Sequence, residues 1–274
     1  ECDWSSDVCS SDLDDLFTGF RKESFHALGR TRDVYRGGHG PTIVVLSEMP
    51  GITPSLLTFA RQLIDQGFSV AIPHLFGRDG QSASNREFAK TFREVCVSRE
   101  FTLFATGSSS RITRWLNELA HHEHVNNGGP GVGVIGMCLT GGFALAMMVD
   151  PVVVAPVLSQ PSLPIGRSEK KKRDLGISAE ELDIVRARAA NGVCVFGARF
   201  SGDKLSPSER FAHLRAVLGD AFIGVEIDSS TGNPWGYPSD AHSVFTEGQD
   251  GKPNSPTSLA MEQLMAFFSE RLSS

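Results

Sequence analysis

The stretch from Gly131 to Val149 constrains the fold of this chain more than any other. It reads GVGVIGMCLTGGFALAMMV. Its first part, residues 132–136, is a short β-branched apolar run bounded by glycines, which is typical of a buried strand. Its second part, residues 139–149, is rich in Leu, Ala and Met, which predicts a helix. A buried strand that passes through a sharp turn directly into a helix is characteristic of α/β folds.

Cys138 stands at that turn, within the sequence GMCLTG. This pattern is typical of a nucleophile elbow, with cysteine in place of serine. The turn lifts the side chain out of the sheet, and the helix N-terminus behind it favours a thiolate over a thiol. A cysteine in an apolar run also has a plainer interpretation, as a small buried hydrophobe. The rest of the chain therefore has to supply the partners that a nucleophile needs.

Strand-like and helix-like segments alternate along the chain, which predicts an α/β fold with a mostly parallel central sheet and helices on both faces. With 274 residues, 40% of them hydrophobic, residues 14–274 can form a single domain. The polar segment 159–174 is expected to be an exposed insertion. Strands are expected at 24–28 and 31–35 (a hairpin), 41–47, 68–73, 132–136, 151–158, 192–196 and 221–227. Helices are expected at 53–66, 88–99, 111–124, 139–149, 178–190, 207–218 and 258–272.

The first residues, Glu1–Leu13, do not resemble the rest of the chain. They read ECDWSSDVCSSDL, without an initiator methionine or the apolar region of a signal peptide. They resemble a translated sequencing adapter, so we interpret residues 1–13 as non-native. Cys2 and Cys9 are accordingly given no function.

Composition excludes several classes of function. The net charge of −6 provides no basic field for nucleic acid. No unbroken apolar run is long enough to span a membrane. The five cysteines do not have metal-ligand spacing, which indicates reduced thiols and a cytoplasmic protein. His121, His122 and His124 lie at a predicted helix end, where histidines interact favourably with the helix dipole, so neither a metal nor another cofactor is expected.

Four chemically reactive side chains follow predicted strands. Glu48 comes after the strand 41–47, Cys138 after 132–136, and Asp203 after 192–196, while His242 lies in the loop after the last strand. In a parallel sheet, ligands bind beyond the carboxyl ends of the strands. The order nucleophile, acid, histidine is that of α/β-hydrolases.

These residues could perform nucleophilic catalysis together. A thiol needs a base to take its proton and a carboxylate to orient that base, which His242 and Asp203 could provide. The backbone N–H groups of Met49 and Leu139 could stabilise an oxyanion. Taken singly, Asp203 could instead cap the following helix, and His242 could be an ordinary loop histidine.

The chain resembles the dienelactone hydrolase family of α/β-hydrolases. The residues that carry the resemblance are VLSEMPGI at 45–52, GFSVAIP at 67–73, GMCLTGG at 136–142, Gly202-Asp203 and AHS at 241–243. The resemblance implies cleavage of a carboxylic ester or lactone by a carboxymethylenebutenolidase-like enzyme that forms a cysteine acyl-enzyme.

The resemblance also implies roles for individual residues. Cys138, Asp203 and His242 would form the triad, and Met49 and Leu139 the oxyanion hole. Glu48 would hold the resting thiol and accept its proton when the substrate arrives.

Two positions depart from the family pattern. Thr140 stands where the family usually has glycine, and Thr246 stands where it has an arginine that binds a substrate carboxylate. Arg99 or Arg111 could replace that arginine, and Ser243 is a further candidate for contact with the small-molecule substrate. The two departures leave open a binding protein of the same fold without productive chemistry. Acyl transfer to an acceptor other than water is a third possibility.

Overall fold

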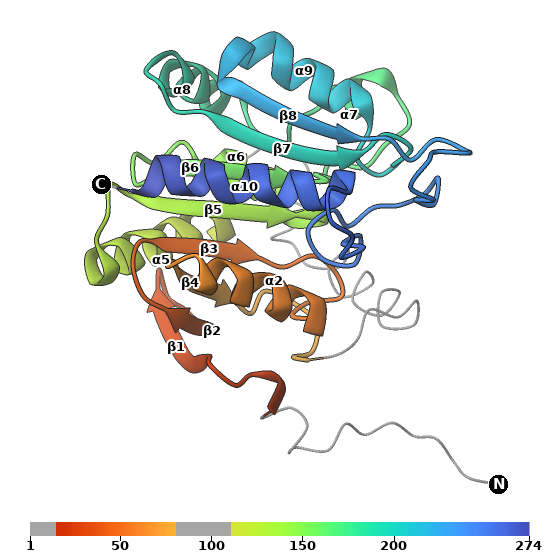
Figure 1. The fold of residues 1–274 in the computed structure, drawn as a ribbon. Helices are drawn as coiled ribbons and strands as arrows, with labels where there is room; N and C mark the ends of the chain where they lie inside the picture. Colours follow the sequence, from red (N-terminus) through yellow and green to blue (C-terminus); the bar gives the residue numbers. More distant parts are fainter. Residues whose placement is uncertain (1–14, 81–110, 274) are drawn as a thin grey trace, which may run out of the picture.

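The predicted strands join into one sheet (Figure 1). The computed structural model describes residues 15–80 and 111–273. In these residues the sheet has eight strands in the order β1-β2-β4-β3-β5-β6-β7-β8. The pairs β1–β2 and β2–β4 are antiparallel and the others are parallel. The strands are β1 (Arg21–Ala27), β2 (Arg30–Gly38), β3 (Thr42–Leu46), β4 (Ser69–Pro73), β5 (Val132–Met137), β6 (Val153–Ser159), β7 (Val195–Phe200) and β8 (Phe222–Ile227).

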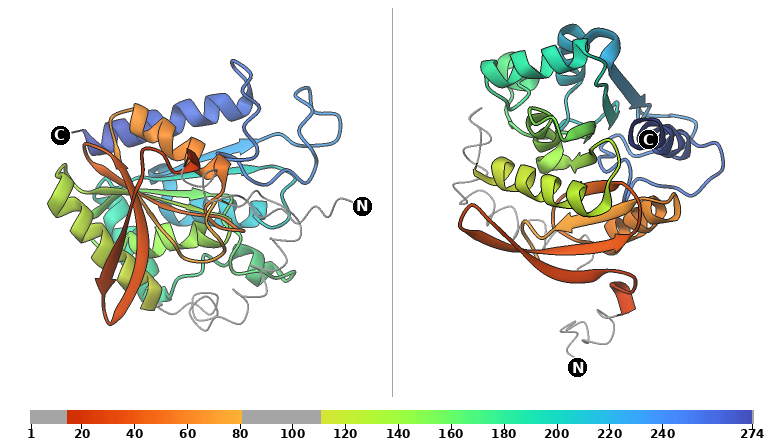
Figure 2. Two further views of the ribbon diagram at one scale, coloured as in Figure 1. Left: turned by 90° about the horizontal axis from the view of Figure 1, so that it is seen from below. Right: turned by 90° about the vertical axis from the view of Figure 1, so that its left-hand side faces the viewer.

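Helices cover both faces of the sheet, as predicted. The α-helices are α2 (Pro54–Asp65), α5 (Arg111–Asn127), α6 (Gly141–Met147), α7 (Glu169–Arg173), α8 (Ala179–Ala190), α9 (Ser208–Leu218) and α10 (Pro256–Leu272). Figure 2 shows α2 and α10 on one side and α5 on the other. The apolar residues of α2 and α10 form one core cluster with the sheet, and those of α5 and α6 form a second. Because both faces are covered, the central strands β3, β5 and β7 are buried throughout, which explains their continuous apolar sequences.

Side-chain caps determine where several helices begin. Thr53 accepts a hydrogen bond from the Leu56 N–H at 3.2 Å and so caps α2. Ser178 and Glu181 form a capping box at the start of α8. Ser255 caps α10 and Pro256 occupies its first turn, so this helix begins two residues earlier than predicted.

Two sequence predictions are wrong in part. Residues 159–164 are buried and α7 follows them, so 159–174 is not an exposed insertion. The buried Arg210 holds this segment, because its guanidinium donates to the carbonyls of Pro161 and Pro164. The strand expected at 192–196 is β7 (Val195–Phe200), because residues 191–193 close the last turn of α8.

Some predictions concern residues that the structure does not describe. Glu1–Leu13 and the helix expected at 88–99 lie outside the described residues. In the described ranges, no helix combines the length and the apolar character that a membrane crossing requires. Of the three neighbouring histidines, His121 contacts Asp150 at 3.0 Å and His122 contacts the Asn126 amide at 3.0 Å.

Candidate active site

The turn after β5 has the strained geometry of a nucleophile elbow. Cys138 has φ of 55°, in the left-handed region that disfavours residues with a Cβ, and its side chain is buried. The backbone folds back tightly, since a Cβ on Gly136 would lie 2.1 Å from the Thr140 carbonyl oxygen. A Cβ on Gly141 would lie 2.6 Å from the Cα of Pro161. Glycine at these two positions therefore permits the turn from β5 into the short 3-10 helix η1 (Cys138–Thr140) and α6.

Thr140 is accommodated at the position where the family pattern has glycine. Its Oγ1 accepts a hydrogen bond from the Met137 N–H at 2.9 Å. The same oxygen lies 2.9 Å from the Leu46 carbonyl oxygen and 3.2 Å from that of Ser47, to which its hydroxyl can donate. The threonine therefore ties the elbow to the end of β3, the strand that leads to Glu48.

Asp203 and His242, predicted from separate loops, are in direct contact. His242 Nδ1 lies 2.7 Å from Asp203 Oδ2. The other oxygen, Oδ1, accepts from the N–H groups of Leu205 at 2.9 Å and Ser206 at 3.3 Å. Asp203 does not cap the following helix, because the N-cap of α9 is Pro207; instead it contacts the histidine and closes the turn at 203–206. One oxygen serves each purpose.

The second nitrogen of His242, Nε2, is not engaged by Asp203. Nε2 is buried and makes no hydrogen bond of normal geometry with the described residues. Burial lowers the pKa of His242, but the hydrogen bond that its Nδ1–H donates to Asp203 and the interaction with the Cys138 sulfur outweigh burial and raise this pKa well above 6.5. The charged imidazole is therefore favoured when Cys138 is a thiolate.

Glu48 is buried at the end of β3 and accepts hydrogen bonds from three neutral donors. Ser243 Oγ donates to Oε2 at 2.6 Å, and Gln160 Nε2 donates to the same oxygen at 3.1 Å. The hydroxyl of Thr246 donates to Oε1. Both Thr246, where the family pattern has arginine, and the predicted substrate-binding Ser243 are thus engaged with this carboxylate. In the described part of the chain, no hydrogen bond joins Glu48 to Cys138.

Gln160 is a site residue that the sequence analysis missed. It lies directly after β6 with a positive φ of 33°, and its side chain is fully buried. Its amide nitrogen binds Glu48, while its Oε1 accepts from the Val244 N–H at 3.3 Å. Gln160 therefore connects Glu48 to the loop that carries His242. Its position directly after a parallel strand could have marked Gln160 as a site candidate. It was not considered because the segment 159–174 was predicted to be an exposed insertion.

Removal of the Thr246 hydroxyl should destabilise this network. Thr246→Val leaves one oxygen of a buried carboxylate without its donor, so we expect the free energy of unfolding to fall by about 1–3 kcal/mol. Urea denaturation would measure the loss, with Thr246→Ser as the control because serine retains the hydroxyl. An equal loss in both variants would contradict a specific role of the hydrogen bond.

The remaining predicted site residues lie in different places. Met49 and Leu139 are buried in the same apolar cluster as Cys138. Arg111 is exposed at the start of α5 and lines a separate pocket with Leu28, Arg30 and others, apart from the Asp203–His242 pair. Arg99 lies outside the described residues.

Comparison with known proteins identifies the family of the chain. The Dienelactone hydrolase family matches residues 30–188, more than half of the chain. None of the curated proteins matches it in sequence. Among solved structures, a dienelactone hydrolase-like promiscuous phosphotriesterase from metagenomic libraries has a TM-score of 0.63 at 17% identity, covering 93% of this chain and 98% of that chain.

Two further structures have the same fold. A cold-adapted esterase from an Arctic intertidal metagenomic library has a TM-score of 0.54 at 14% identity and covers 93% of this chain and 94% of its own. TT1662 from Thermus thermophilus has a TM-score of 0.56 at 12% identity, covering 93% of this chain and 99% of that chain. At these identities the likeness concerns the fold.

Proposed function

The chain belongs to the dienelactone hydrolase family, and from this premise we propose that it cleaves a carboxylic ester or lactone through a cysteine acyl-enzyme. The observation that carries the proposal is the 2.7 Å contact between Asp203 and His242, a histidine whose pKa is also raised by the sulfur of Cys138 at the strained elbow. This arrangement provides a nucleophile, a base and a group that orients the base.

The reaction proceeds in two steps. The Cys138 thiolate, whose proton has passed to His242 Nε2, attacks the ester carbonyl carbon, and the N–H groups of Met49 and Leu139 stabilise the oxyanion. The C–O bond then breaks, and the alkoxide leaves with the proton from Nε2. In the second step His242 takes a proton from water as the water attacks the thioester, which releases the acid and restores Cys138.

In this proposal Glu48 positions the histidine loop. Both carboxylate oxygens of Glu48 already accept hydrogen bonds. Two of these hydrogen bonds come from the hydroxyls of Ser243 and Thr246, which lie in that loop. If Glu48 took the thiol proton, as the resemblance implied, it would have only one of its four lone-pair positions open to receive it. The proton therefore passes to His242, whose Nε2 has no competing partner. A thiol nucleophile functions in a reducing compartment, which favours a cytoplasmic enzyme.

Intact-mass spectrometry after brief mixing with 4-nitrophenyl acetate tests the proposal. We expect a mass gain of one acetyl group in the wild type and none in Cys138→Ala, together with turnover. An adduct that is released faster by an added alcohol than by water would indicate acyl transfer. Binding of the ester without an adduct or turnover would indicate a binding protein instead.

A further inference from the structure

The three residues that follow β6, 160–162, are in direct contact with the nucleophile elbow. The Ser162 N–H donates to the Cys138 carbonyl oxygen at 2.9 Å. Pro161 packs against the start of α6, where a Cβ on Gly141 would lie 2.6 Å from the Pro161 Cα. The backbone of this segment therefore supports the turn that carries the proposed nucleophile.

The side chain of Gln160 joins the same segment to two further parts of the site. Its Nε2 donates to Glu48 Oε2 at 3.1 Å, and its Oε1 accepts from the Val244 N–H at 3.3 Å. Val244 is two residues from His242 in the chain. One fully buried side chain thus bridges the end of β3 and the histidine loop, from a segment that also contacts the elbow.

The two partners of this side chain require an amide between them. A backbone N–H can only donate a hydrogen bond, and an ionised carboxylate can only accept one. Gln160 satisfies both because its side chain carries a donor and an acceptor. The Ser159 hydroxyl also donates to Oε1 of Gln160. The amide is therefore held in one orientation, with both of its ends engaged.

The backbone of Gln160 is strained. Its φ of 33° lies in the left-handed region that disfavours residues with a Cβ. Such strain persists where surrounding contacts over-determine the conformation, and it is concentrated at functional sites. Here the Gln160 N–H donates to the Ala198 carbonyl at 2.7 Å, and the Gln160 carbonyl accepts from the Ser162 hydroxyl at 3.1 Å. Backbone and side chain together fix Gln160 between β7 and the histidine loop.

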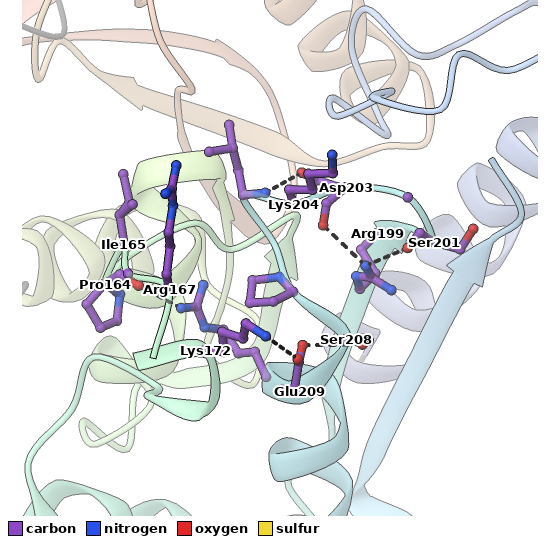
Figure 3. A pocket seen from close by; sticks show the side chains of 15 residues that line it. Pro164, Ile165, Arg167, Lys172, Arg199, Ser201, Asp203, Lys204, Ser208 and Glu209 are labelled. Carbon is purple, nitrogen blue, oxygen red and sulfur yellow. Dashed lines mark hydrogen bonds and ion pairs between the residues drawn. The ribbon is translucent and has the colours of Figure 1, made fainter. Parts of the chain in front are cut away.

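The outer side of the segment is anchored by a buried arginine. Arg210 donates to the carbonyls of Pro161 at 2.5 Å and Pro164 at 2.8 Å. Burial lowers the pKa of Arg210 to about 10, so its charge persists at neutral pH. Figure 3 shows Pro164 and Asp203 lining one pocket, from the segment after β6 and the loop after β7. Arg210 thus holds the outer side of the segment, while the amide of Gln160 holds its inner side.

We propose that Gln160 is a positioning residue, whose amide holds the histidine loop where His242 can take the Cys138 proton. This inference rests on the proposed function and extends it, because Gln160 acts through Glu48 and Val244 and not on the substrate. Without the amide, the histidine loop should shift relative to the elbow. A displacement of about 1 Å can lower a rate by roughly 10²-fold.

Gln160→Glu tests this role, because it keeps the acceptor and replaces the donor. At high pH two carboxylates face each other, and the bridge to Glu48 is lost. At low pH the introduced carboxyl holds a proton, since Ser243 and Thr246 keep Glu48 ionised and a neighbouring charge raises the pKa of a carboxyl. We expect kcat/KM for phenyl acetate to lie within about threefold of the wild type at about pH 5.5, and roughly 10- to 100-fold below it at about pH 8. Initial rates across this range would measure the additional alkaline limb.

Two further variants separate positioning from stability and from added charge. Gln160→Met fills a similar space without either hydrogen bond, so its kcat/KM should be low at every pH and lack the additional limb. Gln263→Glu adds the same charge at an exposed position on α10 and should keep the wild-type profile. Circular dichroism would verify folding at each pH. A wild-type pH profile in Gln160→Glu, or the same change in Gln263→Glu, would overturn the inference.

Alkylation of Cys138 by iodoacetamide tests the inference without turnover. Peptide mass spectrometry follows this cysteine alone, and a thiolate paired with a charged His242 reacts below the ordinary thiol pKa of about 8.5. In Gln160→Met, the pH of half-maximal alkylation should rise by about one unit toward that value. Equal midpoints in the two proteins would overturn the inference. If the wild type does not cleave phenyl acetate, the proposed function fails, and the alkylation midpoints alone decide whether Gln160 positions the histidine.

Discussion

Cys138→Ala should abolish ester turnover, with a loss of kcat on the order of 10⁴-fold or more. The reason is that Cys138 is the proposed nucleophile, and without its sulfur no acyl-enzyme can form. Initial rates with phenyl acetate would measure the loss. Circular dichroism and thermal unfolding would verify the fold, which should persist because alanine removes a single buried sulfur atom. Turnover within tenfold of the wild type would refute the nucleophile assignment.

Cys138→Ser is the more demanding companion variant. Serine retains a nucleophilic atom at the elbow, but a hydroxyl gives up its proton far less readily than a thiol. The raised pKa of His242, which depends in part on the Cys138 sulfur, favours a charged imidazole opposite a thiolate. We therefore expect Cys138→Ser to be strongly impaired rather than to behave as a serine hydrolase. Near wild-type activity would show that the site does not depend on a thiolate.

Asp203→Asn should lower kcat by roughly 10³–10⁴-fold, because an amide at this position can no longer hold the histidine in the required tautomer. The substitution is well matched to the structure. Asparagine keeps an oxygen that can accept from the Leu205 and Ser206 N–H groups, so the turn before α9 is preserved. Asp203→Ala removes that acceptor as well and should be less stable. Equal activity of Asp203→Asn and the wild type would exclude Asp203 as the orienting acid.

The same variant should change the pH dependence in a defined direction. Asp203 raises the pKa of His242, so Asp203→Asn should lower this pKa and move the alkaline limb of kcat/KM to lower pH. The same pKa also determines how the free energy of unfolding of the wild type changes with pH. The protonated histidine stabilises the wild type fully below its ordinary pKa of 6.5, and this contribution is lost as the pH rises through the raised folded-state pKa. An unchanged alkaline limb in the variant would contradict the role of Asp203.

The sequence by itself determined the features that depend on local pattern. Runs of β-branched residues alternating with amphipathic segments fixed the type of fold, because burial on both faces of a parallel sheet demands such runs. The glycines around Cys138 determined the elbow, since a Cβ at position 136 would collide with the backbone. The rule that reactive residues follow strands correctly brought Asp203 and His242 together.

Tertiary structure alone decided which polar groups share a buried space. Glu48 and Thr246 are 198 positions apart in the chain, and no local pattern indicates that the threonine hydroxyl donates to that carboxylate. Gln160 was hidden in a segment whose composition is polar, yet the segment is buried because Arg210 binds its carbonyls. Periodicity along a chain reports which face of an element is apolar, whereas pairing of distant polar groups depends on how the elements pack.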